Sequence, residues 1–158
     1  MLTGQHYQNA YLCDDIEAAI EKMRSYYSFG EIPIIDVDQQ VKTKDGLKHL
    51  VSRICFIWID NLQIELIQPI KDETGIYNCD PSHTANGALH FHHSCARISD
   101  WDKFRAAVDQ QDLPLAIERS DDNPHLKYLY LDARSLLGHY LEFTWMSDEM
   151  WKRLGAPS

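Results

Sequence analysis

The sequence lacks the features that mark membrane, nucleic-acid-binding and secreted proteins. It has no apolar run of the roughly 18 residues needed to cross a bilayer, and its opening residues MLTGQHYQNAYLCDD lack the basic flank and apolar core of a signal peptide. Basic residues are scarce, with 15 Lys and Arg against 24 Asp and Glu, and the formal net charge of -9 repels nucleic acids and anionic lipids. We therefore expect a cytoplasmic protein whose partners include neither nucleic acid nor membrane.

Cysteine patterns that would indicate disulfides or a metal site are missing as well. The four cysteines form no C-x-x-C motif and are widely spaced. Three of them lie in apolar, strand-like stretches, which predicts buried free thiols. The four are Cys13, Cys55, Cys79 and Cys95.

The first half of the chain predicts a strand, a helix and three more strands. The first strand covers residues 6–13, and Asp14 and Asp15 can cap a helix whose apolar residues recur at helical spacing from Ile16 to Met23. Further strands are expected at 34–37, 51–59 and 62–67, with a polar hairpin region at 38–48.

The second half repeats this order. A strand at 89–98 precedes a helix that begins at Ser99 and Asp100, and strands follow at 113–118, 127–132 and 138–145. Aligning QNAYLCDDIEAAIEKM with HSCARISDWDKFRAAV places Gln8 opposite His93 and Asp15 opposite Asp100.

This repeat predicts an α+β fold of two tandem βαβββ modules, which form a curved, cup-shaped mixed sheet with the helices on the outside. The 158 residues, 44% of them hydrophobic, suffice for one sizeable core. We expect a single domain over 1–158, with module one at about 5–69, a linker at 70–88, module two at about 89–146 and a tail at 147–158. The tail is expected to form a short helix within 147–154.

Strand alternation places polar side chains inside the cup. In the strand at 62–67, Glu65 lies on the face opposite Ile64 and Leu66, and in the last strand Glu142 occupies the matching place. Gln8 and His93 open the first strands of the two modules. Because only alternate residues share a face, we expect His92 to point away from His93.

One imidazole, two carboxylates and one amide oxygen suit a divalent cation of intermediate hardness, with water sites left open for catalysis. Such a cation can polarise a carbonyl while a glutamate moves a proton. Taken singly, a strand glutamate is more often a solvated residue and a strand histidine more often a structural one. The four residues indicate a site because they occupy equivalent places of a repeat.

Four motifs in this order resemble the vicinal-oxygen-chelate superfamily over nearly the whole chain, and specifically its glyoxalase I and methylmalonyl-CoA epimerase branch. They are Gln8, the IEL of 64–66, the LHFHHSCARISD of 89–100 and the YLEF of 140–143. The resemblance implies one divalent metal ion (Zn, Ni, Co, Mn or Fe) held by Gln8, Glu65, His93 and Glu142, with Glu142 as the mobile base. It also implies a homodimer.

The activity that this resemblance implies is that of a metal-dependent lyase or isomerase, which abstracts a proton next to the carbonyl of a small acyl thioester or α-hydroxy carbonyl. Leu12 and Pro69 stand where glyoxalase I has an arginine and an asparagine near its thiol cofactor, which argues against glutathione. The strand at 51–59 offers Arg53 but no second acid for a two-base epimerase. Gln8, at the place of a histidine ligand, argues against an extradiol dioxygenase.

The cup-facing neighbours of the four ligands predict a mixed aromatic and polar pocket for a small-molecule substrate. These residues are His6, Gln63, Ile67, Phe91, Cys95 and Tyr140. Two alternatives stay open: a non-catalytic small-molecule-binding protein of the bleomycin-resistance type, which would use the same cup without metal, and a structural or partner-binding domain.

Overall fold

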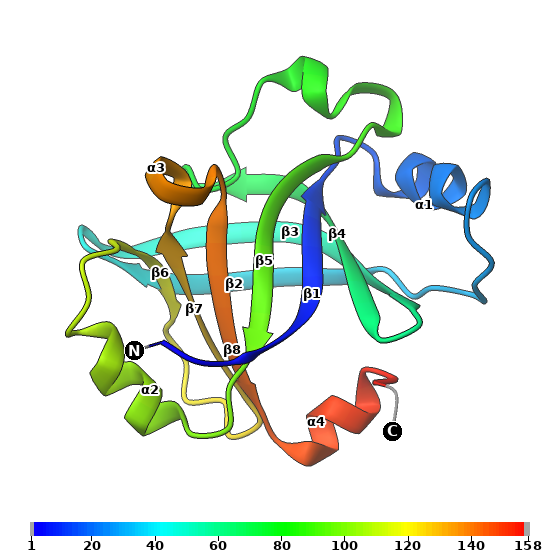
Figure 1. The fold of residues 1–158 in the computed structure, drawn as a ribbon. Coiled ribbons are helices and arrows are strands. Elements are labelled where there is room, and N and C mark those ends of the chain that lie inside the picture. Colours follow the sequence, from blue (N-terminus) through cyan, green and yellow to red (C-terminus); the bar gives the residue numbers. More distant parts are fainter. Residues whose placement is uncertain (1, 157–158) are drawn as a thin grey trace.

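The computed structural model describes residues 2–156, which form a closed barrel in the strand order β1-β4-β3-β2-β6-β7-β8-β5 (Figure 1). The first half of the chain supplies β1 (Gln5–Leu12), α1 (Ile16–Arg24), β2 (Ile35–Thr43), β3 (Gly46–Ile59) and β4 (Leu62–Asp72). The second half supplies β5 (His90–Arg97), α2 (Trp101–Val108), β6 (Leu115–Arg119), β7 (Leu126–Asp132), α3 (Arg134–Leu137), β8 (Tyr140–Met146) and α4 (Asp148–Arg153). Two short 3-10 turns, Pro81–His83 and Ala85–Gly87, lie between the halves.

The sheet is mixed, because β1 pairs in parallel with β4 and β5 pairs in parallel with β8, while the other neighbours are antiparallel. This arrangement confirms the predicted α+β class and the repeated βαβββ order. The sheet curves further than the expected cup and closes, since β2 also pairs with β6 at two positions, Val41 with Arg119 and Lys42 with Glu118.

The hairpin expected within 38–48 is present, but the strand predicted at 34–37 was too short, because β2 runs on through Thr43. Strands β2 and β3 are paired in unbroken register from Ile35 opposite Ile54 to Thr43 opposite Gly46, so the turn is confined to two residues. Gly46 has a φ of 102°, which a residue with a Cβ adopts only with strain. Polar residues occupy this hairpin because one of its faces meets solvent along most of its length.

Helices α1 and α2 begin at the two aspartates that the alignment matched. The Asp15 side chain accepts a hydrogen bond from the backbone N–H of Ala18, and Asp100 accepts one from Lys103. Both helices pack their apolar faces on the outside of the barrel (Figure 1). None of the described helices has the length and apolarity to cross a membrane.

The C-terminal helix α4 lies across one end of the barrel (Figure 1), in agreement with the helix expected within 147–154. Ser147 caps it by accepting a hydrogen bond from Met150 N–H. The Trp151 ring packs edge-on against Tyr7 at a centroid distance of 4.9 Å, and Trp58 Nε1 donates a 2.6 Å hydrogen bond to the Leu154 carbonyl. These contacts close this end with aromatic side chains.

Candidate metal centre

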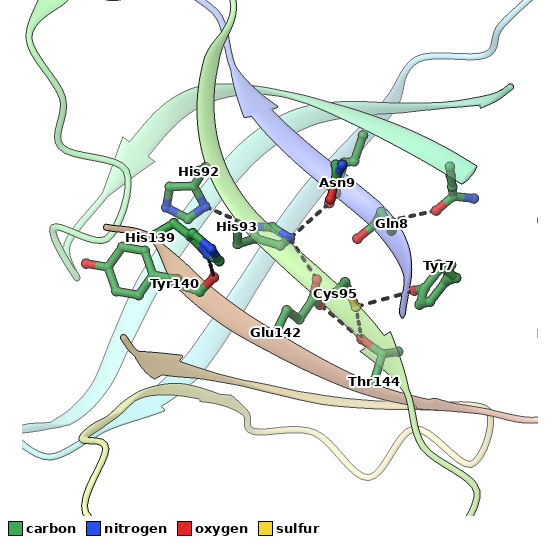
Figure 2. Close-up of polar contacts among 12 residues, drawn as sticks. Tyr7, Gln8, Asn9, His92, His93, Cys95, His139, Tyr140, Glu142 and Thr144 are labelled. Atoms are coloured by element: carbon green, nitrogen blue, oxygen red, sulfur yellow. Dashed lines mark hydrogen bonds and ion pairs between the residues drawn. The ribbon is translucent and has the colours of Figure 1, made fainter. Parts of the chain in front are cut away.

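The four residues expected as metal ligands lie on four adjacent strands of the barrel. Glu65 is on β4, Gln8 on β1, His93 on β5 and Glu142 on β8, and these strands are neighbours in that order. All four side chains are buried, with exposed fractions of 3% for Gln8, 8% for Glu65, 0% for His93 and 9% for Glu142. The repeat therefore brings the four residues to one side of the barrel interior. Figure 2 shows Gln8, His93 and Glu142 on their three strands.

Three of these side chains form a compact cluster. One potential ligand atom from each of Glu65, His93 and Glu142 lies within 4.8 Å of the other two. His93 Nε2 is 2.9 Å from Oε2 of Glu142 and 3.6 Å from Oε2 of Glu65. These distances are short enough for ion pairs with a protonated imidazole. Even so, His93 Nε2 makes no hydrogen bond with either carboxylate.

Gln8 stands beside this cluster with a free acceptor. Its Nε2 donates a 2.7 Å hydrogen bond to Oε1 of Gln63, its register partner on β4. That bond leaves Oε1 of Gln8 buried without a hydrogen-bond partner. A buried acceptor and a buried imidazole nitrogen without partners, next to two carboxylates, are what a divalent cation would satisfy. The residues present thus fit the expected metal.

Electrostatics disfavour this cluster without a cation. Burial, and next the nearby Glu142 carboxylate, hold the pKa of Glu65 well above its usual value. In residues 2–156 neither glutamate is ion-paired to a lysine or arginine; both lie instead beside His93. Buried like charges of this kind raise the free energy of the folded chain, so their presence points to a functional site.

Glu142 is oriented by its neighbours on the barrel interior. The Thr144 hydroxyl donates a 3.1 Å hydrogen bond to Oε1 of Glu142 and lies 3.3 Å from Cys95 Sγ. Cys95 Sγ is in turn 3.6 Å from the Tyr7 hydroxyl (Figure 2). Sequence reasoning did not single out Thr144 or Tyr7, although alternation from Glu142 already pointed to Thr144.

The expectation that His92 points away from His93 was wrong, because β5 has a bulge there. Across the β1–β5 ladder Ala10 pairs with His93 and Tyr11 pairs with Phe91, which leaves His92 as the extra residue. A bulge turns two consecutive side chains to the same face. His92 is accordingly buried, with its Nδ1 2.8 Å from Nδ1 of His93.

A cavity of about 280 Å³ lies inside the barrel next to the cluster. Its wall is mostly apolar and aromatic, with the Glu65 and Glu142 carboxylates and a single cationic side chain, Arg119. It is lined by Tyr7, Gln8, Ile35, Val37, Gln39, Ser52, Ile54, Phe56, Gln63, Glu65, Tyr77, Arg119, Leu126, Tyr128, Tyr130, Glu142, Thr144, Met146, Met150 and Leu154.

Of the six residues predicted to line the pocket, Gln63 lines this cavity. Cys95, Ile67 and Tyr140 are buried, Cys95 against Thr144 and Tyr140 against the His92 ring. His6 and Phe91 lie outside the barrel: His6 is exposed, and Phe91 is 37% exposed.

Two bulges explain the outward residues. In the β1–β5 ladder His6 pairs with Ala96 and Gln8 with Cys95, so Tyr7 is the extra residue on β1, as His92 is on β5. Tyr7 therefore turns into the cavity next to Gln8, and His92 turns inward next to His93. His6 and Phe91, which strict alternation placed inside, face outward.

No protein-family model matches the sequence, and no curated protein matches it. Solved structures do resemble it. A methylmalonyl-CoA epimerase in complex with methylmalonyl-CoA and NH4+ superposes with a TM-score of 0.61 at 14% identity, covering 92% of this chain and 96% of that one. A Streptomyces coelicolor methylmalonyl-CoA epimerase variant in complex with 2-nitronate-propionyl-CoA gives 0.61 at 14% identity, covering 92% and 97%. The Mycobacterium tuberculosis methylmalonyl-CoA epimerase gives 0.57 at 16% identity, covering 96% and 93%.

These likenesses confirm the predicted resemblance at the level of the fold. The chain has the fold of the methylmalonyl-CoA epimerases over more than nine-tenths of its length. At such low identity the activity has to be argued from the site itself.

Proposed function

We propose that this protein is a metal-dependent isomerase or lyase of the vicinal-oxygen-chelate type, which removes a proton next to the carbonyl of a small organic substrate. In this proposal Gln8, Glu65, His93 and Glu142 hold one divalent cation, and Glu142 is the base. The observation that carries the proposal is the buried cluster, in which two carboxylates and an imidazole converge within 4.8 Å beside a cavity.

The residues of the site suit proton transfer. A bound divalent cation supplies polarisation of the substrate carbonyl and stabilisation of the negative charge that develops as the adjacent proton leaves. Glu142 lies on the cavity wall, where one of its oxygens is held by Thr144, so its carboxylate is oriented to accept that proton. The mostly apolar and aromatic lining lowers the local polarity, which strengthens electrostatic interactions within the cavity.

The cavity also limits the substrate. Its volume of about 280 Å³ lies just below the range of pockets that take drug-sized ligands. An acyl group or a small α-hydroxy carbonyl fits inside it, whereas a whole coenzyme would extend outside. Among the lining residues, Glu65 and Glu142 are the two carboxylates, and both belong to the cluster. We infer that one carboxylate removes and returns the proton on a single face of the substrate.

Metal content and proton exchange test the proposal together. Protein purified without chelators or tags should contain stoichiometric metal, which Glu65→Ala and Glu142→Ala should lose. Candidate α-hydroxy carbonyls and acyl thioesters, incubated in D2O with metal-loaded protein, should gain deuterium next to the carbonyl, as read by mass spectrometry. Glu142→Gln should abolish this exchange, while the exposed control Glu31→Gln should preserve it.

Metal-free wild-type protein that binds small molecules tightly would contradict the proposal and favour the non-catalytic, bleomycin-resistance type of function. Protein that takes up neither metal nor a small molecule would favour a structural or partner-binding role.

We also propose that the chain acts as a single domain and that it pairs as a homodimer, as its resemblance to the vicinal-oxygen-chelate superfamily suggests. Unfolding should then give one cooperative transition, and sedimentation should give about twice the 18.4 kDa chain mass. A species of 18.4 kDa alone would contradict the dimer.

A further inference from the structure

His92 and His93 form a direct contact between imidazole rings inside the barrel. Their Nδ1 atoms lie 2.8 Å apart, and His92 Nε2 lies 2.8 Å from the carbonyl oxygen of Ile76 (Figure 2 shows the two rings). On its other side, His93 Nε2 faces the carboxylates of Glu65 and Glu142. The two rings therefore connect a backbone carbonyl to the proposed metal centre.

Counting donors and acceptors fixes the proton on His92. The Ile76 carbonyl can only accept, so His92 Nε2 must carry the hydrogen. A neutral imidazole has one hydrogen, which leaves Nδ1 of His92 as an acceptor. Two rings in Nδ1-to-Nδ1 contact need one donor, so Nδ1 of His93 must donate.

His92 is neutral because nothing near it would stabilise a positive charge. Its ring is buried among the rings of Tyr77, Tyr130 and Tyr140 at centroid distances of 5.1, 6.1 and 5.0 Å. In residues 2–156 the two carboxylates of the site lie beside the His93 ring and form no contact with His92 that would stabilise a charge there. An unpaired buried charge is strongly unfavourable.

The Ile76 carbonyl is itself held in place. Asp72 accepts hydrogen bonds from the backbone N–H groups of Thr74, Gly75 and Tyr77, at 2.8, 2.9 and 2.9 Å. The turn after β4 is thereby fixed around a carboxylate. A rigid acceptor at Ile76 makes the orientation of His92 a property of the fold.

We propose that His92 is a positioning residue, which keeps a hydrogen on Nδ1 of His93 and so reserves His93 Nε2 for a divalent cation. In a neutral His93 the lone pair is then on Nε2, where it can bind a cation. In a positively charged His93 both ring nitrogens carry hydrogen, and the cation displaces the hydrogen on Nε2. Histidine ligands of metals are commonly oriented by an acceptor on the second ring nitrogen. Here that acceptor is another histidine, placed by a bulge in β5.

This inference rests on the proposed function, but its test can be read without metal. Nitrogen NMR of protein labelled with 15N-histidine, metal-free and then loaded with Zn²⁺, reports which ring nitrogens carry hydrogen. The signals of His93 and His92 are assigned by their loss in His93→Gln and His92→Gln. We expect hydrogen on Nδ1 of His93 and on Nε2 of His92 in both states, with a coupling across the contact between the two Nδ1 atoms.

Variants of His92 supply the second measurement. His92→Phe, which removes the acceptor, should lower the affinity for Zn²⁺ about 10- to 100-fold in calorimetric titration. His92→Gln, whose amide oxygen can accept from His93 Nδ1, should restore most of that loss. The exposed His125→Gln serves as a matched control and should bind Zn²⁺ like the wild type.

Several outcomes would overturn the inference. A neutral His93 with its only hydrogen on Nε2 in wild-type protein contradicts it, and so does a folded His92→Phe that binds Zn²⁺ as tightly as the wild type. If His92→Phe fails to fold, the 15N spectrum of the wild-type protein still shows which nitrogen of His93 carries the hydrogen. Wild-type protein that binds no Zn²⁺ but carries hydrogen on Nδ1 of His93 refutes the proposed function and leaves the tautomer assignment standing.

Discussion

The Thr144 hydroxyl donates a hydrogen bond to Oε1 of Glu142 and leaves Oε2 of the same carboxylate 2.9 Å from His93 Nε2. One oxygen of Glu142 is thus held by its own strand, while the other faces the proposed cation site. Because both residues are on β8, two positions apart, the pleat of a single strand positions the proposed base.

Removing this hydroxyl should loosen Glu142. We expect Thr144→Val to lower the affinity for Zn²⁺ about 10-fold, since a residue that only supports a ligand has such an effect. Thr144→Ser keeps the hydroxyl and should stay close to wild type. Calorimetric titration measures both, and equal affinities for the valine and serine variants would show that the hydrogen bond does not orient the carboxylate.

Glu65→Gln should stabilise the metal-free protein and weaken metal binding. The raised pKa of Glu65 means that folding disfavours its charged form, so that above the usual carboxyl pKa stability falls as pH rises. Removing that charge should raise the midpoint of thermal unfolding at pH 8 by a few degrees, equivalent to about 1 kcal/mol.

The gain from Glu65→Gln should shrink as the pH falls towards 4, because the carboxyl is then protonated in the folded state and mostly protonated in the unfolded state. The same variant should lose at least about 100-fold in Zn²⁺ affinity, beyond the typical cost of losing a merely supporting residue. A variant that is destabilised at pH 8 and binds Zn²⁺ normally would place Glu65 outside the metal site. Glu31 is exposed in the loop that follows α1, so Glu31→Gln is a control for the change of net charge.

Thiol reactivity should separate Cys79 from the other cysteines. Burial raises the pKa of Cys13 and of Cys55 to about 12, whereas Cys79 is partly exposed. At pH 8 a thiol with a pKa of about 12 is about 10⁻⁴ thiolate. Burial raises the pKa of Cys79 as well, but its partial exposure gives a reagent access to the sulfur, which the three buried thiols lack. We expect a disulfide reagent to label one thiol rapidly in native protein and four in urea, and none rapidly in native Cys79→Ser.

The raised thiol pKa values also predict how the stability of the fold changes with pH. Above pH 8.5 the unfolded chain ionises its thiols while the folded chain keeps them neutral, so the free energy of unfolding should fall as pH rises from about 8.5 towards about 12. Cys55→Ala should flatten this decline in urea-unfolding curves. An unchanged slope would mean that Cys55 ionises as easily in the folded protein.

Trp151→Ala should detach α4 from the end of the barrel. The ring of Trp151 contacts Tyr7 and Trp58, and the Arg97 guanidinium lies 4.3 Å from its centroid. Truncating a large aromatic side chain that is partly buried should cost about 2 kcal/mol, or about 4–8 °C in thermal unfolding. Exposure of the apolar cavity should increase the fluorescence of an apolar dye, and Lys152→Ala, on the same helix, should leave both measurements unchanged.

Sequence patterns predicted what depends on local periodicity. The apolar positions around Glu65 and Glu142 placed both carboxylates inside the sheet, and the structure buries both there. Likewise, the aspartates at 15 and 100 cap the two helices as expected. In each case the position of the side chain depends only on residues close to it in the sequence.

Predictions failed where pairing between strands decides. Strict alternation placed His6 and Phe91 inside, but bulges on β1 and β5 turn Tyr7 and His92 inward instead. A bulge is a mismatch between two strands far apart in the sequence, so neither strand shows it alone. Closure of the barrel, through Val41 and its partner on β6, depends on such long-range pairing as well.

The junction between β2 and β6 is the shortest in the barrel. It holds two paired positions, against seven between β1 and β5. Arg119, one of the paired residues, also lines the cavity. Because so few hydrogen bonds cross this junction, the barrel should open there first. Successive N–H groups of a strand point to opposite neighbours, so of Val41 and Lys42 the amide that faces β6 should exchange with deuterium ahead of those in β1.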